Sequence, residues 1–171
     1  MEKLVLFVCT GNSCRSPMAE AWFNKRAPEL GLAGYRAISA GLCADHGGTA
    51  SLQAQSVMRE NGASLEKFRS QALSLELLEC ADLIVAMTDA HRARIVAAAP
   101  ETAGRCFRLL DFAAGGEVTD PYGGSVDAYR RCFAGMKAAV ENLIGKLRDG
   151  NGLKLETGGC EMSEKIMDFT S

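Results

Sequence analysis

Near its N-terminus the chain places a short apolar run directly before a loop of small polar residues, and this join constrains the fold most. The run covers residues 4–8, and the loop reads CTGNSCRS over residues 9–16. A continuously apolar stretch of this length is typical of a central parallel strand that is buried on both faces. Pro17 then stands where the first turn of a helix tolerates proline, and Met18 and Trp22 follow at helical spacing. The sequence therefore predicts a strand, a short loop and a helix in direct succession.

The same alternation of strand and helix continues along the chain. We expect further strands at 35–40, 82–87 and 106–110, and helices at 49–61, 73–80, 89–99 and 127–148. Strands that alternate with helices imply a mostly parallel sheet with ligands at the C-terminal ends of its strands. The predicted fold is therefore an α/β three-layer sandwich, a single domain with a mostly parallel four-stranded sheet and helices on both faces.

Length, charge and cysteine content limit the organisation and the partners. A chain of 171 residues, 47% of them hydrophobic, fills one core, which we expect in residues 1–150, followed by an appendage at 151–171. A net charge of −2 provides no broad basic field, so neither nucleic acid nor a membrane is an expected partner. The first apolar run is too short for a signal peptide or a membrane span. Seven scattered cysteines suit a reducing cytoplasm, the location that we expect.

The loop has the composition of an anion-binding site. Five residues separate Cys9 from Arg15, which is the spacing of a phosphate-binding loop. Because the loop joins a strand to a helix, its backbone N–H groups and the helix N-terminus converge on one point of partial positive charge. Gly11 and Asn12 tolerate the backbone geometry that such a turn needs. The loop is therefore expected to bind phosphate or another oxyanion.

The same field suits a cysteine nucleophile. It stabilises a thiolate at Cys9, Arg15 can hold two phosphate oxygens, and Ser16 can donate its hydroxyl to the sulfur. A basic leaving group also needs a proton donor, for which we select Asp120, held by Pro121 in a stiff loop. The alternative interpretation is a core cysteine at a strand end, a surface arginine, a helix cap and a simple Asp-Pro turn.

Taken together, these motifs resemble the low-molecular-weight protein tyrosine phosphatase family over about residues 3–147. The matching positions are Cys9, Arg15, Ser16, Pro17, Asp120 and Pro121, with further matches at 39–41 and 81–87. The resemblance implies phosphorylated protein substrates and a two-step reaction without metal or cofactor. In that reaction Cys9 forms a phosphocysteine, while Asp120 acts first as an acid and then as a base.

The resemblance also assigns roles to the surrounding residues. Substrate binding is expected from Thr10, Gly11, Asn12, Ser13, Cys14 and Tyr122, and support of the loop from Ser16, Ser39 and Pro121, with Asn12 contributing there too. The family often has a histidine in the supporting network, and Phe68 takes the aligned position here, so we expect a smaller network. The two histidines, His46 and His91, are expected to be loop and surface residues.

Three related classes of enzyme, which differ in their substrates, are candidates for the function of this chain. Tyrosine-specific members place a branched apolar residue where this chain has Ser13, whereas bacterial protein arginine phosphatases have a hydroxyl residue there. We therefore favour phosphoarginine, with phosphotyrosine close behind. Thioredoxin-coupled arsenate reductase shares the loop sequence, but Met87 and Arg94 stand near the places where its further cysteines are needed. A non-catalytic phosphate-binding module would not need Asp120.

Cys14 offers a route to regulation. It lies five positions from Cys9 along a tightly curled loop, so the two sulfurs could form a disulfide. An accessible thiolate beside a second thiol is the arrangement of a reversible redox switch. We therefore expect that peroxide silences the enzyme and that a thiol reductant restores it.

Overall fold

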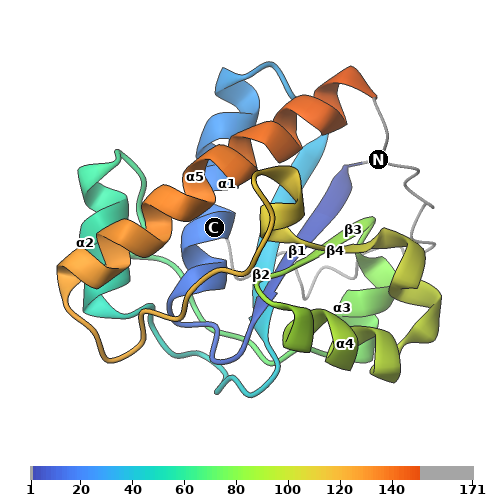
Figure 1. The fold of residues 1–171 in the computed structure, drawn as a ribbon, viewed down its shortest axis with the longest axis horizontal. Coiled ribbons are helices and arrows are strands. Elements are labelled where there is room, and N and C mark those ends of the chain that lie inside the picture. Colours follow the sequence, from blue (N-terminus) through green and yellow to red (C-terminus); the bar gives the residue numbers. More distant parts are fainter. Residues whose placement is uncertain (1, 151–171) are drawn as a thin grey trace.

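The structure is a computed structural model that describes residues 2–150, so the predicted appendage at 151–171 lies outside the described residues. The chain order of the elements is traced in Figure 1. They are β1 (Lys3–Cys9), α1 (Arg15–Glu29), β2 (Tyr35–Gly41), α2 (Leu52–Glu60), α3 (Leu75–Cys80), β3 (Leu83–Ala86), α4 (Asp89–Ala98), η1 (Pro100–Arg105), β4 (Cys106–Arg108), η2 (Leu109–Phe112) and α5 (Val126–Asp149).

The strands form one sheet in the order β2-β1-β3-β4, and every neighbouring pair is parallel. Cys9, the last residue of β1, pairs with Gly41, the last residue of β2. From β1 the chain first adds a strand on one side and later a strand on the other. The connections therefore diverge at the C-terminal end of β1, which is where open parallel sheets bind ligands.

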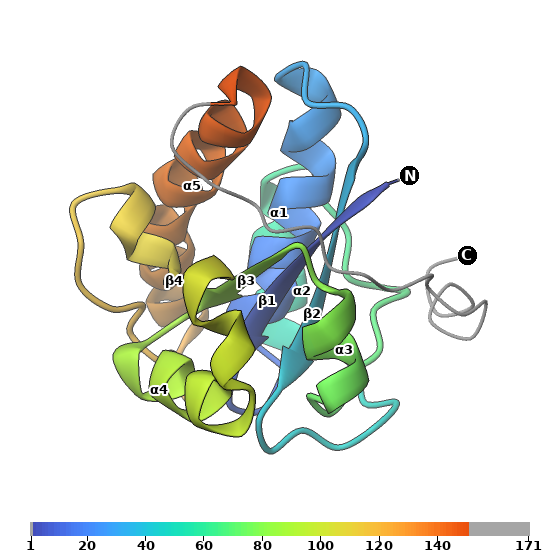
Figure 2. The same ribbon diagram turned by 90° about the vertical axis from the view of Figure 1, so that its right-hand side faces the viewer.

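Helices cover both faces of the sheet (Figure 2). The buried side chains accordingly form two hydrophobic clusters. Val5 and Phe7 of β1 pack in the cluster that includes α1, α2 and α5, whereas Leu4 and Leu6 pack in the cluster with α3 and α4. Alternate residues of a strand point to opposite faces, so a strand between two helical layers must be apolar throughout. This explains the uninterrupted apolar run, and the predicted three-layer α/β fold is confirmed.

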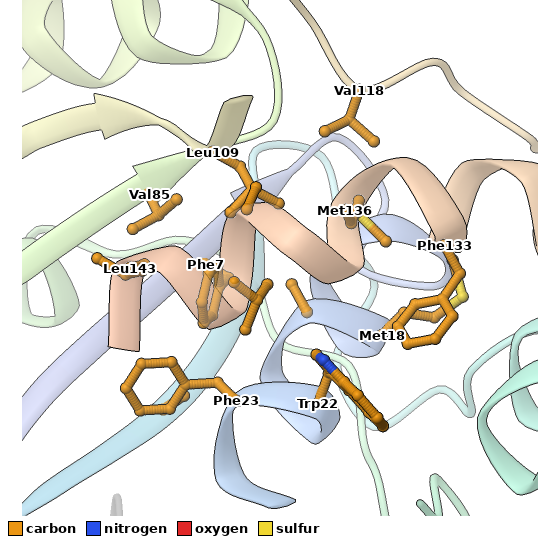
Figure 3. Close-up of a cluster of buried hydrophobic side chains, with 14 of the residues drawn as sticks. Phe7, Met18, Trp22, Phe23, Val85, Leu109, Val118, Phe133, Met136 and Leu143 are labelled. Atoms are coloured by element: carbon orange, nitrogen blue, oxygen red, sulfur yellow. The ribbon is translucent and has the colours of Figure 1, made fainter. Parts of the chain in front are cut away.

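The larger cluster fixes the position of α1 against the sheet and α5. The rings of Trp22 and Phe133 meet edge to face with centroids 5.4 Å apart, and those of Phe7 and Phe23 lie 6.0 Å apart. Figure 3 labels further members of this cluster, which are Met18, Val85, Leu109, Val118, Met136 and Leu143. Because α1 begins at Arg15, this packing also fixes the end of the polar loop.

Some element ends differ from the sequence prediction. The helix expected at 49–61 begins only at Leu52, since Ser51 caps it by accepting a hydrogen bond from the Ala54 N–H. The strand expected at 106–110 ends at Arg108, whose N–H donates to Asp111 in the first turn of η2.

No helix within residues 2–150 is long and apolar enough to span a membrane. The domain boundary near residue 150 remains a prediction.

Candidate active site

The loop between β1 and α1 is held against the chain that follows β2. The carbonyl oxygens of Cys9 and Thr10 accept hydrogen bonds from the N–H groups of Leu42 and Cys43, at 3.0 and 2.8 Å. A Cβ atom on Gly41 would lie 2.6 Å from the Thr10 carbonyl oxygen, closer than real Cβ atoms come to any neighbour. Asn12 has a φ of 50°, in the left-handed region. The loop shape therefore depends on a glycine outside the loop and an asparagine inside it.

A chain of hydrogen bonds leads to the Cys9 sulfur. The sulfur lies 2.9 Å from the Ser16 hydroxyl, and the Asn12 side-chain amide donates to Ser16 at 2.9 Å and to Ser39 at 2.8 Å. An amide NH₂ group only donates, so each serine oxygen accepts one bond and keeps its own proton to donate elsewhere. Ser16 can therefore donate to the Cys9 sulfur, and this direction suits a thiolate.

Behind the loop, this network is larger than the sequence suggested. Ser39 donates to the Glu20 carboxyl group at 2.6 Å, and burial raises the pKa of Glu20 to about 7. The backbone N–H of Gln71 donates to the Asn12 side-chain oxygen, and its side chain donates to the Ser39 carbonyl, both at 2.9 Å. Gln71 and Glu20 thus extend the network beyond the residues that the sequence analysis named, while Phe68 packs against the hydrophobic core.

Arg15 and Asp120 meet at the mouth of the loop. The Arg15 side chain is only 6% exposed, donates to the Val118 carbonyl at 3.3 Å and forms an ion pair with Asp120 at 3.2 Å. The Asp120 carboxylate also accepts the Tyr122 N–H at 3.1 Å, across the buried Pro121. The Asp120 side chain remains 52% exposed. The acidic group is thus positioned by its own turn and by the arginine, and solvent can reach it.

A pocket of about 430 Å³ opens over the loop. Its lining includes a third cysteine, Cys43, and these residues expected at the site: Cys9, Thr10, Gly11, Ser13, Cys14, Arg15, Asp120 and Tyr122. Asn12 is absent from this lining, because its side chain is fully buried in the network behind the loop. Ser39 lies in the same buried network, on β2.

The thiol of Cys14 has polar partners of its own, separate from those of Ser16. Its sulfur lies 3.0 Å from the Tyr129 hydroxyl and 3.4 Å from the Ser13 hydroxyl. Burial raises the pKa of Tyr129 to about 12, so its phenol stays protonated at neutral pH and can donate to the sulfur. Cys9 and Cys14 are both free thiols.

The expectation that His91 is a surface residue was wrong, because its side chain is buried and contacts the loop. It lies in the first turn of α4, and its Nε2 atom is 2.8 Å from the Thr10 hydroxyl. Burial, and next the positive charge of Arg15, lower the pKa of His91 below its usual value. His46 is exposed in a loop, as predicted.

Sequence reasoning missed three residues of the site. A signal existed for Glu20, an acidic residue four positions after Ser16 and therefore on the same face of α1. For His91, the signal was its place just after the strand that neighbours β1. Gln71 carried no signal, since it follows no motif. Within residues 2–150, no group of three His, Cys, Asp or Glu side chains could hold a metal ion.

Comparison with known proteins agrees with this geometry. The chain matches the family described as "Low molecular weight phosphotyrosine protein phosphatase" over residues 4–152. It is 38% identical to a protein-arginine-phosphatase of Geobacillus stearothermophilus, over 84% of this chain and 95% of the relative. A low molecular weight protein tyrosine phosphatase structure from T. tengcongensis superposes with a TM-score of 0.80 at 39% identity, covering 85% of this chain and all of that one.

A third relative bears on the chemistry. It is a YwlE arginine phosphatase mutant with a phosphorylated active-site serine in place of cysteine, at a TM-score of 0.81 and 35% identity over 88% of this chain and 99% of that one. The fold and the relatives define the class, which is a cysteine-dependent protein phosphatase and hence a hydrolase. The chain belongs to the low-molecular-weight protein tyrosine phosphatase family.

Proposed function

We propose that this protein hydrolyses phosphorylated arginine side chains of proteins through a phosphocysteine on Cys9, with phosphotyrosine as a second substrate. The observation that carries the substrate preference is Ser13, a small hydroxyl residue in the pocket lining beside Cys9. The protein-arginine-phosphatases among the relatives support it.

Binding begins at Arg15. In the structure its guanidinium is held by Asp120 and the Val118 carbonyl. A phosphoryl group carries more charge than either partner and presents two oxygens to the planar guanidinium, so it takes their place. Loop N–H groups and the start of α1 hold the remaining oxygens. Arrival of the phosphoryl group therefore also frees the Asp120 carboxyl group.

In the first step the Cys9 thiolate attacks phosphorus in line with the leaving nitrogen. A phosphorus–sulfur bond forms and the phosphorus–nitrogen bond breaks, while Asp120 transfers its proton to the leaving guanidino nitrogen. Arg15 and the loop N–H groups hold the equatorial oxygens as negative charge spreads over them. The dephosphorylated arginine leaves as a guanidinium, and the phosphoryl group remains on Cys9.

In the second step Asp120, now ionised, takes a proton from water. The water oxygen attacks phosphorus and the phosphorus–sulfur bond breaks, so inorganic phosphate is released. The electron pair returns to the Cys9 sulfur, where the Ser16 hydroxyl stabilises the thiolate by its hydrogen bond. The enzyme is then ready for another turnover.

Ser13 supports phosphoarginine because of its size and polarity. Its carbonyl is fixed by the Ser51 N–H at 2.9 Å, which places its side chain at the pocket wall. A hydroxyl there can hydrogen-bond a guanidinium or the attacking water, whereas a branched apolar side chain would pack on an aromatic ring. The residue at position 13 is therefore expected to decide the preference between phosphoarginine and phosphotyrosine.

The test compares kcat/KM on a phosphoarginine peptide and a phosphotyrosine peptide of matched sequence, with Cys9→Ser as the inactive blank. We expect phosphoarginine to be preferred, Ser13→Ile to shift the preference towards phosphotyrosine, and the matched control Ser13→Thr to keep it. A parent enzyme that is strict for phosphotyrosine would contradict the substrate assignment. Sustained arsenate turnover with thioredoxin would contradict the reaction class.

We also propose that the enzyme works in the cytoplasm and that a Cys9–Cys14 disulfide, reversed by a thiol reductant, regulates it. Two free thiols on one loop support the proposed disulfide, since both line the same pocket. After peroxide treatment and then reductant, the parent should recover, whereas Cys14→Ser should remain oxidised on Cys9 and recover poorly. Equal recovery would remove the proposed switch.

A further inference from the structure

His91 reaches the nucleophile loop from a different part of the chain. It belongs to α4, which starts just after β3, and β3 pairs with β1. The Thr88 hydroxyl caps the helix by accepting the His91 N–H at 3.2 Å. The imidazole Nε2 then lies 2.8 Å from the hydroxyl of Thr10, the residue directly after Cys9.

The environment of the ring indicates which nitrogen carries the proton. His91 is 6% exposed, and its Nδ1 is buried without a hydrogen-bond partner among the described residues. Orphaned buried N–H groups are rarer in proteins than under-used acceptors, so the proton belongs on Nε2. The charged groups that face the ring are Arg15, Arg94, Asp120 and Glu117, and burial with Arg15 dominates, so the pKa of His91 is lowered and the ring is neutral at neutral pH.

A neutral ring with its proton on Nε2 donates to the Thr10 oxygen. The Thr10 hydroxyl then accepts that bond and keeps its own proton free, because a hydroxyl has one donor and two acceptor positions. Thr10 lines the pocket together with Cys9 and Arg15. The opposite tautomer would instead use the Thr10 proton to bond the imidazole, and the hydroxyl would offer the pocket only lone pairs.

We infer that His91 is a positioning residue that orients the Thr10 hydroxyl as a hydrogen-bond donor to the phosphoryl oxygens in the Cys9 pocket. This inference rests on the proposed function, since it assigns a further contact to the same phosphate site. Thr10 is the group that touches the anion, and His91 acts through it.

The first measurement is the tautomer of His91 in the unmodified protein, from the ring ¹⁵N chemical shifts at neutral pH. The chain has two histidines, so a His46→Gln variant assigns the signals. The proposal requires a neutral ring protonated on Nε2. A ring protonated on Nδ1 would overturn it, and this result does not depend on catalysis or on any substitution at the site.

The second measurement is a double-mutant cycle on the Kd of inorganic phosphate, followed by NMR or calorimetry. Thr10→Val keeps the shape and removes the hydroxyl, and His91→Phe keeps a ring and removes the donor. We expect Thr10→Val to weaken phosphate binding about tenfold, as for loss of one hydrogen bond to a charged group. His91→Phe should weaken it by a smaller factor, and it should have no further effect in the Thr10→Val background.

Independent, multiplicative effects of the two substitutions would overturn the inference. If His91→Phe fails to fold, the tautomer measurement still decides. Because phosphate binding needs no turnover, a protein that passes both measurements and hydrolyses neither phosphopeptide would contradict the proposed function and leave the Thr10–His91 inference standing.

Discussion

At the scale of single residues, Asn12 combines a backbone role with a side-chain role. Its left-handed φ of 50° turns the loop, and its amide donates to two serines at once. Asparagine is among the few residues other than glycine that visit this conformation readily. The direction of both serine hydroxyls therefore depends on one NH₂ group.

Asn12→Asp tests this dependence with an almost isosteric change. A carboxylate keeps the turn but cannot donate, so both serine hydroxyls lose their donor and a negative charge is added behind the Cys9 thiolate. We expect kcat/KM to fall about 100-fold at neutral pH, the effect of losing two hydrogen bonds that stabilise a charge. Denaturant unfolding should show that the fold persists; unchanged kinetics would contradict the assigned donor direction.

Glu20 should make stability depend on pH. Burial raises its pKa from 4.5 to about 7, so the folded state binds a proton that the unfolded state has already released between these values. The resulting stabilisation is complete below pH 4.5 and is lost as pH rises through 7. Glu20→Gln keeps an acceptor for Ser39 without the charge. We therefore expect the variant to be more stable than the parent at pH 8, by about 3 kcal/mol at most.

Urea unfolding of the parent and Glu20→Gln at pH 5 and pH 8 measures this difference. At pH 5 the difference should be at most about 1 kcal/mol, because the folded parent keeps its carboxyl group protonated and only the unfolded chain is mostly ionised. The same difference at both pH values would show that Glu20 is ionised throughout.

At the scale of elements, the end of β2 acts as a support for the loop after β1. Gly41 occupies the place of closest approach, where an added Cβ would meet the Thr10 oxygen at 2.6 Å and the Asn12 nitrogen at 2.9 Å. Both contacts are with backbone, which cannot rotate away as a flexible side chain can. The sequence 39–41 therefore shapes the active site from a neighbouring strand.

Gly41→Ala should push the nucleophile loop out of place. We expect kcat/KM to fall by about 100-fold, since displacements of 1 Å at a reacting centre have effects of this size, and the melting temperature to fall as well. Gly104→Ala is the matched control, because its Cβ would meet nothing within 4 Å. An active, stable Gly41→Ala protein would mean that the loop tolerates displacement.

The sequence predicted those elements and loops that depend on a local pattern of residues. The apolar run at 4–8 identified β1, and the spacing of Cys9 and Arg15 identified the loop that follows it. Contacts that depend on how separate elements meet were not predictable. His91 is polar on a helix whose other residues are mixed, and only the pairing of β1 with β3 brings it to Thr10.

At the scale of the whole molecule, the domain boundary remains a prediction. α5 ends at Asp149 and is followed by Gly150 in the left-handed conformation, a common way for helices to stop. A chain truncated after Gly150 should keep kcat/KM within about twofold of the full chain and unfold in one cooperative transition. Loss of activity or a broadened transition would place residues of 151–171 inside the domain.

The same architecture separates the site from both ends of the described chain. The Lys3 N–H, at the start of β1, bonds the Gly34 carbonyl, and Arg148, near the end of α5, bonds the Leu30 carbonyl. Lys3 and Gly34 lie at the N-terminal end of β1 and β2, whereas Cys9 lies at the C-terminal end of β1, and α5 ends on the same side of the molecule as the strand starts (Figure 1). A reporter, purification handle or solid support joined at either end of residues 2–150 would therefore leave the mouth of the pocket facing outward. A whole folded protein could then be presented to an immobilised enzyme.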